Sequence, residues 1–140
     1  MASVAALYTP EVLALATGLS RYPLTDDLSL RGDARSATCG STVTVGLALD
    51  SAGRIKAVGL RAHACAIGQA AAAIFAEAAI GENRADLLQA EASITQWLAG
   101  NVAGPGWPGL TAIAPARAYP ARHPAILLAW RAALAALPTA

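Results

Sequence analysis

The sequence predicts an α+β domain in which a small antiparallel sheet of two to three strands is covered by several helices. Two features carry this prediction: apolar and polar residues alternate in Thr42–Leu49, and apolar residues recur at helical spacing after Cys65. The predicted order is a helix, then the sheet, then further helices, with neither an internal repeat nor a domain boundary. We therefore expect one domain over residues 1–140.

The N-terminal part predicts a short helix and an edge strand. Thr9 is a favoured N-cap and Pro10 suits the first helical position, so a helix to about Leu19 is expected. Residues 28–31 predict a short edge strand. The small and polar residues 32–40 predict a loop.

A β-hairpin is the clearest local pattern. Thr42–Leu49 places its apolar residues on one face: Val43, Val45, Leu47 and Leu49. A glycine-containing turn follows at 50–53, and residues 54–62 return as the antiparallel partner. One face of this sheet needs cover, and three helices are expected to supply it: residues 66–80, 85–98 and 124–137.

Capping residues set the expected ends of these helices. Cys65 opens a helix to about Ile80, which Gly81 stops. Asn83 caps the next helix, with Asp86 completing an approximate capping box. That helix presents its apolar residues at helical spacing: Leu87, Ala90, Ile94, Trp97 and Leu98.

The C-terminal part predicts a loop and two helices. A loop at 100–109 carries Trp107, a short helix is expected at 110–116, and Pro124 begins the last helix. One face of the last helix repeats every three or four positions: Leu127, Trp130 or Arg131, Leu134 and Leu137.

The composition excludes several classes of protein. Hydrophobic residues make up 56% and charged residues 14% of the chain, which argues against disorder, and the abundance of alanine predicts close helix packing. The net charge is +1 and the basic residues are scattered, so nucleic acid is not an expected partner. No secretory signal opens the chain and residues 64–80 are too polar to span a bilayer, so we expect a cytoplasmic protein away from membranes. Two cysteines in that compartment are more often free thiols or ligands than a disulfide.

Three short segments carry the residues with chemistry. Cys39-Gly40-Ser41 places a thiol beside a flexible turn, although an idle cysteine fits as well. Cys65 lies at a predicted helix N-terminus, where thiolate is favoured, and an inert core cysteine is the alternative. Arg122 and His123 beside a helix start could approach a metal or an anion, or belong to a solvated loop. Antiparallel pairing is expected to bring the two cysteines to the same end of the sheet.

Together these segments resemble the iron–sulfur cluster assembly scaffold family that includes IscU, SufU and the N-terminal domain of NifU. That family has a Cys-Gly-Asp loop before a strand and later a cysteine followed by Ala-Ile and a small-residue helix. The segments that match in order and spacing are Cys39-Gly40, Cys65-Ala66-Ile67 and Ala70–Ala73, and a SufU-like tail is seen in Pro120-Ala121-Arg122 and Leu128-Ala129-Trp130.

The chain departs from that family at two ligand positions. The family's aspartate is Ser41 here, and its third cysteine is Ala125. Metal sites of this kind usually take four ligands, and histidine nitrogen sometimes replaces thiolate. The four candidate ligands are therefore Cys39, Cys65, His63 and His123.

The resemblance implies a scaffold and not an enzyme. Such a protein would bind iron, an iron–sulfur cluster or zinc weakly through Cys39 and Cys65. Two alternatives stay open: a degenerate binding or regulatory paralogue without metal, and a sulfur-transfer protein that accepts persulfide sulfur. The implied partners are a cysteine desulfurase and other cluster-assembly proteins, and a homo-oligomer stays open.

Overall fold

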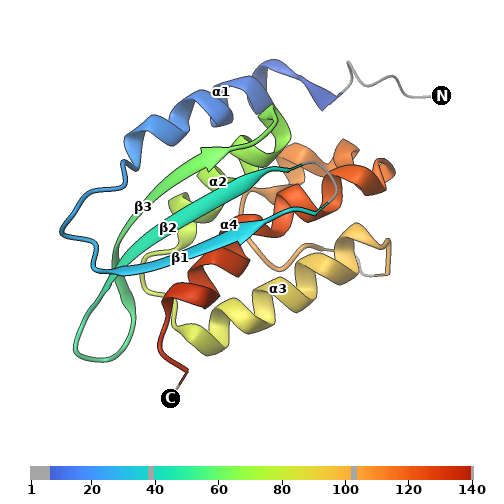
Figure 1. Ribbon diagram of the computed structural model, residues 1–140. Coiled ribbons are helices and arrows are strands. Elements are labelled where there is room, and N and C mark those ends of the chain that lie inside the picture. Colours follow the sequence, from blue (N-terminus) through green and yellow to red (C-terminus); the bar gives the residue numbers. More distant parts are fainter. Residues whose placement is uncertain (1–6, 38–39, 102–103, 140) are drawn as a thin grey trace.

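A three-stranded antiparallel sheet with helices packed over one of its faces forms the protein (Figure 1). This computed structural model describes residues 7–37, 40–101 and 104–139. The strands are β1 (Leu30–Arg35), β2 (Thr42–Leu49) and β3 (Ile55–His63). The α-helices are α1 (Pro10–Gly18), α2 (Ala66–Ala78), α3 (Arg84–Leu98) and α4 (His123–Ala136), and the 3-10 segments are η2 (Leu19–Arg21), η3 (Leu110–Ala118) and η4 (Pro120–Arg122). The predicted α+β class is confirmed.

The predicted hairpin is confirmed. β2 has the expected bounds, and its partner β3 runs one residue later at each end than residues 54–62. Thr42 pairs with His63, so the segments before β2 and after β3 meet at one end of the sheet. Val45 and Leu47 are buried, whereas Leu49, at the end of the strand beyond a register shift, is half-buried. Cys39, predicted to lie at this end, falls outside the described residues.

The predicted edge strand at 28–31 and loop at 32–40 were wrong in their bounds, since β1 continues to Arg35. Gly32 pairs with Val45 and faces α4. A Cβ at Gly32 would lie 2.1 Å from the carbonyl oxygen of Ala132 and 2.5 Å from the backbone nitrogen of Ala136. The backbone of α4 passes directly over Gly32, so this position in the strand has no room for a side chain.

On the opposite face, a loop packs over the middle of the sheet. Gly46 pairs with Gly59 on that face, and a Cβ on either would collide with the loop at 23–28. Towards the end where β2 begins, the same face carries one row of polar side chains: Arg35, Thr42 and His63. Arg35 and His63 are exposed.

The helices stack in two layers on the first face. α2 and α4 pack against the sheet, α1 packs on α2, and α3 packs on α4 (Figure 1). The capping box of α3 is confirmed, with Asn83 Oδ1 accepting from the Asp86 N–H at 2.9 Å and Asp86 Oδ2 accepting from the Asn83 N–H at 3.0 Å. All five apolar residues predicted to face inwards from α3 are buried. Cys65 is the N-cap of α2 and not its first helical residue.

An aromatic cluster joins α2, α4 and the loop before η3. The Phe75 and Trp107 rings stack with centroids 5.6 Å apart, and Trp130 meets each of them edge-on with centroids 5.4 Å apart. Trp107 Nε1 donates to the Ile74 carbonyl oxygen at 3.1 Å, which holds the loop on α2. The predicted short helix at 110–116 is instead the 3-10 segment η3, whose Pro115 lacks an N–H to donate. No helix in the described ranges has both the length and the apolar run needed to cross a bilayer.

The substitution Gly32→Ala is expected to destabilise the protein by about 3 kcal/mol, because the added methyl must displace the α4 backbone. The free energy of unfolding from denaturant titration measures this loss. Gly18→Ala is the matched control, since nothing lies within 4 Å of a Cβ there, and it should change stability by no more than about 0.5 to 1 kcal/mol. A Gly32→Ala chain as stable as wild type would show that α4 does not lie over β1.

Candidate ligand-binding site beside Cys65

A hollow of about 280 Å³ opens where the sheet, the start of α2 and the turn before α4 meet. The residues lining it are Gly40, Ser41, His63, Ala64, Cys65 and Arg122. They come from the loop before β2, the connection from β3 to α2, and η4. The pairing of Thr42 with His63 brings the first two segments together, so the hollow is a direct product of the hairpin.

Cys65 occupies the N-cap of α2 in an extended conformation, with φ −64° and ψ 169°. Its thiol is free and half-buried, and it makes no capping hydrogen bond to the helix. The Gln69 side chain donates to the Ala64 carbonyl oxygen at 3.0 Å, which ties the first turn of α2 to the connection before it. The N–H groups of that first turn therefore have no side-chain cap from Cys65.

The two positions where the resembling family has further ligands also lie close to Cys65. Ser41 lines the same hollow and is 6% exposed. Ala125 is 1% exposed, and its Cβ lies 3.5 Å from the point where a Cβ on Gly68 would be. Because Gly68 is in the first turn of α2, Ala125 packs against the start of that helix. Both positions are thus occupied by neutral, buried residues.

The two candidate histidines differ in their surroundings. His63 is exposed and lines the hollow. His123 is half-buried, and its Nε2 lies 3.1 Å from the Arg117 carbonyl oxygen. His123 is not among the residues that line the hollow, whereas its neighbour Arg122 is. The four-ligand set of the two cysteines and two histidines stays a prediction, since Cys39 lies outside the described residues.

The donors in the hollow do not by themselves fit a resident metal ion. Within residues 7–37, 40–101 and 104–139, no three side chains of His, Cys, Asp or Glu gather closely enough to hold one. A structural zinc site takes four such ligands. Among the residues lining the hollow, His63 and Cys65 can donate to a metal, while Arg122 adds a positive charge. If the predicted ligand Cys39 joined His63 and Cys65, the ligand set would consist of two thiols and one imidazole.

Solved structures similar to this chain support the resemblance. An N-terminal domain of a nitrogen-fixing NifU-like protein from Brucella abortus has a TM-score of 0.78 and 28% identity, with 93% of this chain and 91% of that chain covered. An iron–sulfur cluster assembly scaffold protein for the SUF system from Fervidobacterium islandicum has a TM-score of 0.83 and 20% identity, with 97% of this chain and 100% of that chain covered. The second likeness shows the fold alone. No family model and no curated protein matches the chain.

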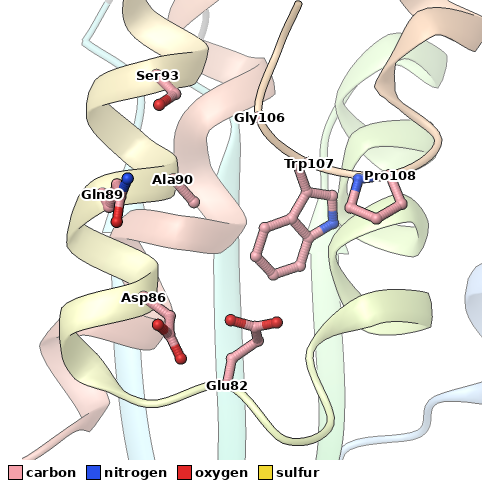
Figure 2. Close-up of a pocket in the computed structure, with 8 residues that line it drawn as sticks. All are labelled: Glu82, Asp86, Gln89, Ala90, Ser93, Gly106, Trp107 and Pro108. Atoms are coloured by element: carbon pink, nitrogen blue, oxygen red, sulfur yellow. The ribbon is translucent and has the colours of Figure 1, made fainter.

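A second hollow, of about 240 Å³, lies between α3 and the loop that carries Trp107 (Figure 2). Figure 2 shows the Glu82 and Asp86 carboxylates turned towards each other beside the Trp107 ring. Partial burial, and then the charge and hydrogen bond of Asp86, raise the pKa of Glu82 above its ordinary 4.5, against a smaller lowering by Arg54. Sequence reasoning did not single out Glu82, although its place just before the capping box of α3 was a signal that it would lie near Asp86.

The raised pKa of Glu82 predicts a pH dependence of stability. The folded protein holds this proton more tightly than the unfolded chain does, so the contribution is fully present below pH 4.5 and is lost as the pH rises through the folded pKa. Glu82→Gln should remove this loss and raise the melting temperature near neutral pH, because a neutral glutamine avoids the cost of partly burying a carboxylate and does not repel Asp86. Melting temperatures from about pH 4 to about pH 7 measure the effect. Glu77→Gln, at an exposed glutamate on α2, is the control; equal pH profiles for wild type and Glu82→Gln would contradict the prediction.

Proposed function

We propose that this chain acts as an iron–sulfur cluster assembly scaffold-like protein of the IscU/SufU/NifU-like family and not as an enzyme, and its likeness to the two solved structures supports the proposal. Its cargo is iron or an iron–sulfur cluster, held weakly through Cys39 and Cys65. The observation that carries the proposal is the free, half-buried Cys65 thiol at the N-cap of α2, in a hollow that also contains Ser41.

The weakness of the binding follows from the two replaced ligands. An aspartate at Ser41 and a cysteine at Ala125 would each bring a negative charge that neutralises a bound cation, and both charges are missing. A cluster shared between two copies of the chain would receive two thiolates from each copy, which is one route to a full set of four. Self-association around the cargo is therefore part of the proposal.

A binding or regulatory role without metal is the second candidate. The observation that favours it is the burial of Ser41 and Ala125, which are 6% and 1% exposed and put neutral side chains where the family has anionic ligands. In this role the fold is kept for a partner surface. Transfer of sulfur from a cysteine desulfurase is a further alternative, since one accessible thiolate at Cys65 suffices to attack a persulfide.

Metal content per chain after anaerobic purification distinguishes these functions. Wild type should retain iron or zinc at well below one ion per chain, and Cys65→Ala should lose it. The double substitution Ser41→Asp with Ala125→Cys should retain more, because it restores two anionic ligands beside Cys65. Metal retention should also decrease as the pH is lowered, since thiolates and neutral imidazoles are the forms that bind the metal.

The matched control is Ser41→Asn with Ala125→Ser, which changes the same positions to side chains of similar size without the two charges. His63→Ala and His123→Ala test the two proposed nitrogen ligands separately. Stoichiometric binding that survives Cys65→Ala would refute the scaffold proposal. A double restoration that binds nothing would favour the role without metal.

A further inference from the structure

The hollow beside Cys65 is positively charged. Arg122 lines it, is half-buried, and has a guanidinium that makes no hydrogen bond or ion pair with any residue in the described ranges. That guanidinium is always protonated and presents a planar set of N–H donors. No aspartate or glutamate is among the residues that line the hollow. The N–H donors of Arg122 are therefore available to a ligand that carries negative charge.

Two further groups add donors to the same hollow. His63 lies in the same lining as Arg122 and carries at least one ring N–H in either protonation state. The 13-residue helix α2 begins there, with an N-cap that supplies no side-chain hydrogen bond to its first turn. Free N–H groups and the helix dipole at such an end favour negative charge. The arginine, the histidine and the helix start thus surround one volume of about 280 Å³.

The positive charge of the hollow is informative when this chain is compared with the family's ligand pattern. With an aspartate and a third cysteine the same place would hold two more negative groups, which suit a cation. Ser41 and Ala125 remove both, while Arg122 stays. Among the residues that line the hollow, the charged side chain is thus the cationic Arg122, which can attract an anion.

We propose that this hollow binds a small anion of carboxylate or oxyanion chemistry, with Arg122 as the main contact and His63 and the start of α2 as further donors. The volume suits an ion of the size of sulfate or the acidic group of a small molecule. The bound anion lies next to the Cys65 thiol, so reaction partners that carry a negative charge are drawn to that sulfur. This inference does not depend on metal binding.

Alkylation of Cys65 in the full chain tests the proposal. Iodoacetate is an anion and iodoacetamide is its neutral analogue, and peptide mass mapping separates modification of Cys65 from that of Cys39. The ratio of the two rates at Cys65 should be about fivefold higher in wild type than in Arg122→Gln, as expected for one unit charge a few Å away. Arg21→Gln makes the same change in net charge outside the hollow and should leave the ratio at the wild-type value.

Protection by unreactive anions gives a second measurement that needs no variant. Sulfate, phosphate and acetate, each compared with chloride at equal ionic strength, are tested for slowing the modification of wild-type Cys65 by iodoacetamide. Protection by sulfate or phosphate alone identifies an oxyanion ligand, and protection by acetate alone identifies a carboxylate. The proposal is overturned if the ratio of the iodoacetate rate to the iodoacetamide rate is equal in wild type and a folded Arg122→Gln. It is also overturned if none of the three anions protects Cys65. Metal content is measured apart from these rates, so failure of the scaffold role and failure of the anion site are distinguishable.

Discussion

The close approach of α4 to β1 over Gly32 is the contact on which the other packing depends. Any side chain at that position would overlap the α4 backbone at Ala132 and Ala136, so only glycine lets the helix lie flat on the strand. Once α4 is placed, Trp130 meets Phe75 and Trp107, and the aromatic cluster holds together α2, α4 and the loop before η3. Alanine supplies most of the remaining contact along α2, which keeps the helix layers close.

The candidate site is a consequence of the same placement. The hairpin brings the loop before β2 beside His63 and Cys65, whereas Arg122 arrives only because α4 begins at that end of the sheet. Ala125 then packs against Gly68 at the start of α2. Three segments far apart in the sequence therefore meet around one thiol, and the charge there is set by which residues the segments carry.

The hollow beside Cys65 and the hollow beside Trp107 carry opposite charge. Arg122 lines the one beside Cys65, and the Glu82 and Asp86 carboxylates line the one beside Trp107. Partial burial, and then the charge of Asp86, raise the pKa of Glu82 there. Both hollows lie at the starts of helices, where backbone N–H groups lack partners within the helix. In α3 the carboxylate of Asp86 satisfies one such group through the capping box, whereas Cys65 leaves the first turn of α2 uncapped.

The sequence by itself determined the fold class, the hairpin, the caps of α1 and α3 and the resemblance to the scaffold family, because alternation, capping chemistry and motif order are local properties of the chain. The tertiary structure decided which segments distant in the sequence come into contact, and local patterns hold no information on this. Gly32 is predicted as a loop residue from the sequence, and only the helix backbone above it explains its place in a strand. Likewise Arg122 and His123 are equivalent in the sequence, yet only Arg122 lines the hollow, because the ring of His123 lies against the Arg117 carbonyl oxygen. Contacts between distant segments depend on how the helices pack, and the spacing of residues within one segment does not predict that packing.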